Sequence, residues 1–180
     1  MLIAQEKRKS NIAEYILYMW QVEDIIRACN FDISLIESNY VSKFRPSPRT
    51  QDELKDWYVN LILMMHEEGI REKGHLSFLN TLVREMNDLH LRLLNSRQEV
   101  QYQNIYTMAV VNLREFKSKL PASNISDVEA CLDALYGLLL LRLKRKVIHK
   151  GTEEAMATFS RLLAYLSDKF HRMEKGELEL

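Results

Sequence analysis

The sequence has few residues that break helices and few that cross-link a chain. Its 180 residues include five glycines, three prolines and two cysteines. Cys29 and Cys131 are far apart and form no Cys-x-x-Cys arrangement, so we expect two reduced core residues rather than a redox motif. No apolar run approaches the roughly 20 residues that a bilayer span requires, so we expect no transmembrane segment and no membrane partner.

An excess of charge of either sign is also absent. Twenty-five Lys and Arg residues balance 25 Asp and Glu residues. The chain therefore has no global positive field that would attract nucleic acid or anionic lipid, and we expect no nucleic-acid partner. The first residues, Met1 to Lys9, lack the apolar stretch behind a basic start that export requires. We therefore expect a cytoplasmic protein.

Apolar residues recur at spacings of three and four along most of the chain. This spacing collects side chains on one face of a helix and differs from the alternation of a half-buried strand. The hydrophobic content of 47% is sufficient for a packed core. We predict an all-α fold, an antiparallel bundle of six or seven helices, because short connections make sequential helices neighbours.

Turn and cap residues divide this single helical domain, residues 1–180. Asp32 is a good N-cap, and the prolines Pro46 and Pro48 interrupt the helical pattern. Capping boxes, in which a hydroxyl and a carboxylate three residues later satisfy first-turn amides, are predicted at 50–53, 96–99 and 126–129. We expect a short N-terminal helical segment over residues 1–44, a linker over 45–49, a main bundle over 50–174 and a frayed tail over 175–180.

One charged residue interrupts the apolar stripe of the first long helix, predicted from about Ser10 to Cys29. At 100° per residue, Glu23 lies within the stripe that contains Ile16 and Ile26. An unpaired buried carboxylate is costly, so Glu23 should pair with Arg27, lie in a polar cavity or face a partner subunit. Trp20, Glu23 and Arg27 share one side of the helix, which makes them candidate ligand-binding residues.

A basic stretch runs from Arg142 to Lys150, and two interpretations apply. Cations in the last turn of a helix complement the helix dipole and need no ligand. Alternatively, Arg142 and His149 lie two helical turns apart on one face, and an arginine with a histidine can bind and cleave RNA. The spacing resembles the Arg-x4-6-His motif of HEPN-type helical ribonucleases, although that family usually has a polar residue where this sequence has Leu143.

Other signatures of catalysis are missing from the sequence. There is no His-Glu-x-x-His, no Gly-rich phosphate loop and no Gly-x-Ser-x-Gly elbow. A single Glu-x-x-His at Glu72 to His75 lacks the second copy that a two-metal bundle needs. His90 lies on an apolar face, where a structural role is favoured. We therefore expect no metal and no cofactor, and an enzyme is the less favoured interpretation.

The N-terminal segment carries a family resemblance. Residues 3–27 read IAQEKRKSNIAEYILYMWQVEDIIR, and this run resembles the opening of a domain-of-unknown-function family of helical proteins from Bacteroidetes. The resemblance implies an all-α fold and a bacterial cytoplasmic setting, and it implies no activity.

Three functional hypotheses remain open. The first is a non-enzymatic helical interaction module that self-associates or binds another helical protein, because Glu23 and apolar residues such as Leu17 and Ile25 suggest a second packing surface. The second is a HEPN-like ribonuclease that uses Arg142 and His149. The third is a helical bundle that binds a small ligand at Trp20, Glu23 and Arg27.

Overall fold

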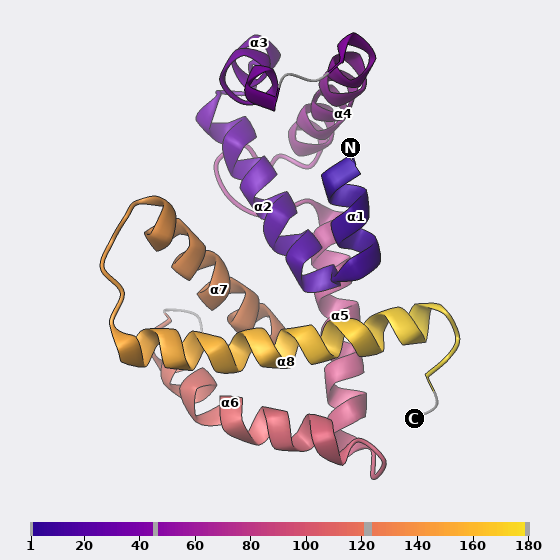
Figure 1. Ribbon diagram of the computed structural model, residues 1–180, viewed down its shortest axis with the longest axis vertical. Helices are drawn as coiled ribbons and strands as arrows, with labels where there is room; N and C mark the ends of the chain where they lie inside the picture. The colour runs from indigo at the N-terminus through magenta and orange to yellow at the C-terminus, as the bar shows by residue number, and fades with distance from the viewer. Residues whose placement is uncertain (1, 45–46, 121–123, 179–180) are drawn as a thin grey trace. The chain divides into compact units, whose positions relative to one another are not determined.

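The computed structural model describes residues 2–44, 47–120 and 124–178. Across these residues it contains eight α-helices and no β-strand, so the all-α prediction is confirmed (Figure 1). A π-helix, Glu37–Val41, and a 3-10 helix, Ser42–Phe44, follow the third helix. The α-helices are α1 Leu2–Ser10, α2 Ile12–Ala28, α3 Ile33–Ile36, α4 Pro48–Glu67, α5 Ser77–Asn95, α6 Val100–Ser118, α7 Asp127–Leu143 and α8 Lys150–Glu174.

The chain divides into two compact units. Unit 1 comprises residues 1–10 and 14–81, and unit 2 comprises residues 11–13 and 82–180. Helix α5 contributes its first residues to unit 1 and the remainder to unit 2. The assignment of residues 1–180 to one domain stays a prediction.

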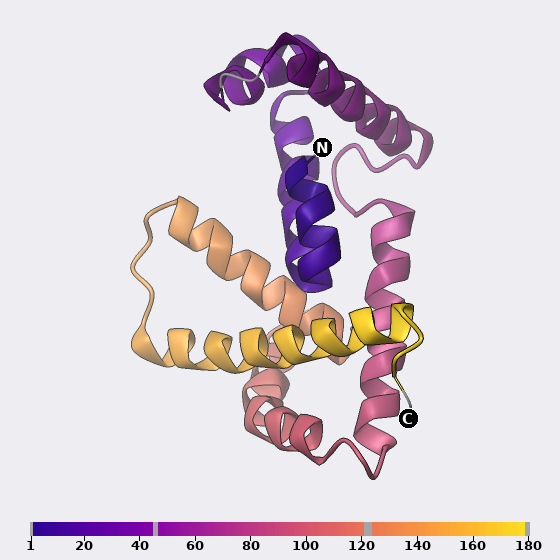
Figure 2. The same cartoon turned by 45° about the vertical axis from the view of Figure 1, so that its right-hand side comes forward.

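Unit 1 contains the charged helix that the sequence singled out. Its apolar stripe is buried as expected, with Ile16 and Ile26 fully covered and Met19 nearly so. The predicted start at Ser10 is two residues early, because a separate short helix, α1, precedes α2 and folds back along it (Figures 1 and 2). The sequence pattern did not reveal α1.

Helix caps decide where several elements begin. The side chain of Asp32 accepts from the amide of Ser34, and that of Ser126 accepts from the amide of Glu129, as predicted. The predicted cap at Thr50 is wrong, because Ser47 caps α4 and Pro48 occupies its first turn. Proline is tolerated there, since the amide it lacks would have no partner within the helix.

Two further features concern a predicted proline break and the 96–99 box. Pro46 lies outside the described residues. Near the predicted box, the helix does stop between α5 and α6. However, the capping box itself does not form, because Glu99 is the N-cap of α6 and makes no side-chain capping bond.

Unit 2 is built around α6, α7 and α8, which pack against one another. Helix α8 crosses α7 and runs opposite to α6 (Figures 1 and 2). Leu113, Leu132 and Phe159 are fully or almost fully buried between them. Helix α8 ends at Glu174, which is the residue where the main bundle was predicted to end. None of the described helices has the length and apolar content needed to cross a bilayer.

Candidate functional site

The misplaced carboxylate of α2 is buried and fully bonded. Glu23 is 1% exposed. Its Oε2 lies 2.6 Å from Nδ1 of His75, and its Oε1 accepts from the backbone amide of Leu76 at 2.9 Å. Nδ1 of His75 can donate to this carboxylate, which only accepts when it is ionised. Both donors stand just before α5, so Glu23 anchors the start of that helix.

The two neighbours of Glu23 on α2 contact the same loop. The indole of Trp20 stacks on the His75 ring, with centroids 4.2 Å apart and planes inclined by 16°. The guanidinium of Arg27 donates to the carbonyl oxygens of Ile70 and Gly74. The structure therefore brings all three predicted residues together, and all three hold residues 70–76. We call this arrangement the α2 clamp.

The ion pair with Arg27, one of the three alternatives predicted for Glu23, does not form. Arg27 pairs instead with Asp24 at 3.0 Å, while Glu23 takes its partners from the loop. Glu68 adds a second carboxylate at the same helix start, where it accepts from the amide and hydroxyl of Ser77. Carboxylates at a helix N-terminus are favoured by the unpaired amides and the helix dipole. These contacts give the buried carboxylate of Glu23 a structural role at the start of α5.

A second polar cluster lies inside unit 2 around His90. Nδ1 of His90 is 2.6 Å from the hydroxyl of Tyr102, and its Nε2 is 3.8 Å from Oδ2 of Asp127. Tyr106 donates to the same oxygen at 2.7 Å, and Nζ of Lys117 lies 2.9 Å from Oδ1. His90 and Tyr102 are buried, which agrees with a structural role for His90.

The charge of Asp127 organises this cluster. The His90 imidazole, the Tyr106 hydroxyl and the Lys117 ammonium hold the pKa of Asp127 well below its usual range, although burial opposes them. Burial and the bond to Asp127 raise the pKa of Tyr106 to about 12. Asp127, Tyr106 and Lys117 also border a pocket of about 360 Å³. The accessible members of the cluster are therefore already bonded to one another.

Arg142 and His149 do not share a helical face. Helix α7 ends at Leu143, and Arg145 follows in the left-handed region with φ 52°. The amide of Lys146 then bonds to the carbonyl of Leu141, a helix-ending pattern that stops the helix there. Arg142 lies in the last turn of α7 and His149 is the N-cap of α8. The helical spacing behind the ribonuclease hypothesis is therefore wrong, and the activity stays a prediction.

An open groove lies among α6, α7 and α8. Its volume is about 840 Å³. Its apolar lining includes Phe116, Leu138, Leu141 and Met156, and His149 borders one end. We call this cavity the α6–α8 groove. Among the described residues, no group of three or more His, Cys, Asp or Glu side chains gathers as a metal ion would need.

Comparison with known proteins places the chain in a family. Residues 1–177 match the family model described as Domain of unknown function (DUF4924). The chain belongs to this family. No curated protein matches the chain, and no solved structure matches it.

Sequence reasoning missed two features of this DUF4924 chain. His75 is the partner of Glu23 from 52 residues away, and only its place between Gly74 and a helix start hinted at a role. The α6–α8 groove was not predicted either. Its signal was Gly137, an isolated glycine inside the apolar pattern of α7.

Proposed function

We propose that this protein is a non-enzymatic helical interaction module that self-associates. We place it in the cytoplasm of a bacterium, and the resemblance of its N-terminal segment suggests a source among the Bacteroidetes. Glu23 does not support a contact with a partner, because its carboxylate is bonded to residues of the same chain in the α2 clamp. The proposal rests instead on the exposed face of α6.

The exposed side of α6 carries three large apolar side chains within a stretch, residues 100–113, that has no charged residue. Val100, Met108 and Val111 are 57%, 62% and 68% exposed. At 100° per residue they lie within about 80° of one another around the helix. No Asp, Glu, Lys, Arg or His occurs from Val100 to Leu113, although 28% of the chain is charged. We call this surface the neutral α6 face.

Such a face suits contact with a second copy of the same chain. In a two-fold dimer the same patch lies on both sides, so a charged patch would face its own charge. A patch without charge avoids that repulsion. Interface cores are depleted in charged residues and enriched in methionine and aromatic residues. The neutral α6 face has both the missing charge and an exposed methionine.

The mass of the protein in solution tests this proposal. Size-exclusion chromatography with light scattering at about 50 µM should give twice the mass of the 21.3 kDa chain. Val111→Glu should yield the mass of one chain, because each copy would bring a carboxylate into the contact. Leu63→Glu is the matched control, since Leu63 is 54% exposed on α4, and it should leave the dimer intact.

Two results would contradict the proposal. A wild-type protein with the mass of one chain at this concentration would exclude self-association. A dimer that tolerates Val111→Glu but is lost in Leu63→Glu would move the contact away from α6.

A further inference from the structure

The α6–α8 groove is apolar over most of its surface, and its charged lining residues are Glu115, Lys119, Asp133 and Lys144. Leu138 and Met156 are largely buried in its lining, whereas Leu141 is 44% exposed at its edge. Gly137 and Gly151 also line it. A cavity of about 840 Å³ lies in the size range of natural ligand pockets.

Two glycines border the groove, and neither is required by the conformation of the backbone. Gly137 lies in the interior of α7 and Gly151 in the first turn of α8. A Cβ atom built on either residue would meet nothing within 4 Å. Glycine inside a helix is less stable than alanine by about 0.5–1 kcal/mol. Because the fold would accept alanine at residue 137, the glycine is best explained by something that occupies the groove.

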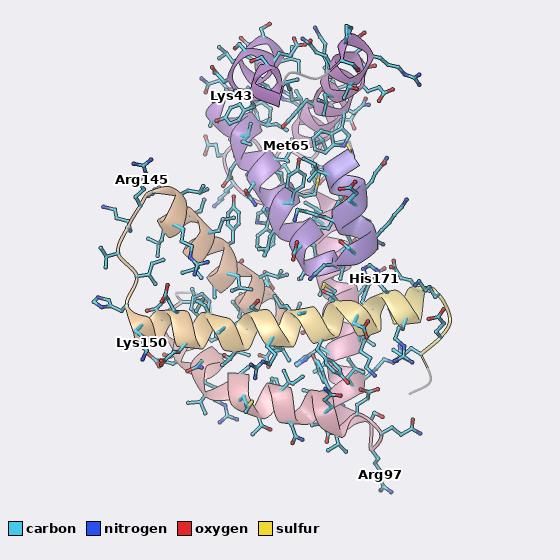
Figure 3. The ribbon with its side chains drawn as sticks, in the orientation of Figure 1. Lys43, Met65, Arg97, Arg145, Lys150 and His171 are labelled. Carbon is cyan, nitrogen blue, oxygen red and sulfur yellow. The ribbon has the colours of Figure 1, made fainter. Side chains whose placement is uncertain are left out.

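Positive charge lies beside one end of the groove. Lys144, Arg145 and Lys146 follow α7, and Lys144 itself lines the groove. Figure 3 shows Arg145 at the turn after α7, pointing away from the helices. Within the described residues, none of these three cations forms an ion pair, whereas Lys119 on the groove wall is held by Glu115 at 2.6 Å. The helix dipole falls off within the last turn, so it does not account for all three.

We propose that the α6–α8 groove binds an amphipathic helix of a partner protein whose apolar face is flanked by carboxylates. Apolar side chains at positions i, i+3 or i+4 and i+7 would enter the groove over Gly137, as in other helix-in-groove complexes. Carboxylates at one end of that helix would pair with Lys144, Arg145 and Lys146. A second copy of this chain fits less well, because its α6 contains a single carboxylate, Glu115, which is held by Lys119.

Two designed peptides test this proposal. Both have about 15 residues and the same leucine face, and their polar positions carry glutamate in one and lysine in the other. Fluorescence anisotropy with the full-length protein should show saturable binding of the glutamate peptide. The lysine peptide should bind at least about tenfold more weakly, because it brings cations to the basic end. Equal binding of both peptides, or no binding of the glutamate peptide at millimolar protein, would overturn the proposal.

Variants locate the binding site. Gly137→Leu should abolish binding by filling the groove, and the control Ala157→Leu, on an exposed position of α8, should not. Gly137→Ala keeps the test valid if the leucine variant fails to fold. This variant should raise the melting temperature of the protein and weaken its binding of the glutamate peptide. Replacing Lys144, Arg145 and Lys146 together by Gln should lower the affinity for the glutamate peptide by about five- to tenfold. Unchanged binding in Gly137→Leu would overturn the proposal.

The oligomeric state separates this inference from the proposed function. If Gly137→Leu converts a dimer to single chains, the groove holds a second copy and this inference is wrong. If the dimer survives while the glutamate peptide no longer binds, the neutral α6 face and the groove serve different partners, as proposed.

Discussion

Removal of the Glu23 side chain tests the α2 clamp most directly. In Glu23→Ala, Nδ1 of His75 and the amide of Leu76 both lose their acceptor, and both face a buried position. A hydrogen bond to a charged group contributes about 1.5–3 kcal/mol, and an orphaned buried partner adds its own desolvation cost. Since His75 retains 30% exposure and can turn to water, we expect a loss of about 3 kcal/mol, near the lower end for broken buried pairs.

Urea unfolding at neutral pH, followed by far-ultraviolet circular dichroism, measures this loss. Glu23→Gln should cost much less, because its amide oxygen can still accept from Leu76 and its shape is conserved. Glu14→Ala is the control, since Glu14 is 57% exposed and its pair with Lys7 should contribute less than about 1 kcal/mol. A Glu23→Ala protein within about 1 kcal/mol of wild type would refute the clamp as a source of stability.

Three further predictions concern unit 2, the start of α4 and the thiols. Asp127→Asn should lower the free energy of unfolding at pH 7. Because the pKa of Asp127 is lower in the folded state than in the unfolded state, the difference in unfolding free energy between variant and wild type should shrink as the pH falls below about 4. Ser47→Ala should lower the unfolding free energy by about 1 kcal/mol and Thr50→Ala by less, as measured by urea unfolding, because Ser47 is the N-cap. Burial raises the pKa of Cys29 and Cys131, so both thiols should react with an aromatic disulfide reagent at pH 8 only after denaturation.

Local signals predicted the helices better than their ends. The spacing of apolar residues recurs in the long helices, so the fold class and the presence of these helices followed from sequence. Asp32 and Ser126 were correct caps because each directly precedes an apolar helical pattern. Near α4, Ser47 and Thr50 are both good caps, and the choice depends on Pro48, which a helix accepts in its first turn.

Contacts between residues that are far apart in the sequence could not be predicted from local sequence patterns. The burial of Glu23 could be predicted from its place on α2, since a helix face is a local property. Its pairing with His75 could not, because it depends on how a loop 52 residues away returns to that face. The same limit affected Arg142 and His149, where a spacing of seven residues implied a shared face only if one helix continued. The left-handed backbone at Arg145 ends that helix.

The charged residue that breaks the apolar pattern of α2 serves the fold, whereas the candidate interaction surfaces are marked by what is missing. The burial of Glu23 is explained by its bonds to the loop before α5. Residues 100–113 of α6 lack charge, where a solvent-facing helix ordinarily carries it. Gly137 lacks a side chain, where a helix interior would gain stability from one. Neither omission helps this chain to fold alone, so each is better explained by a surface that another helix covers.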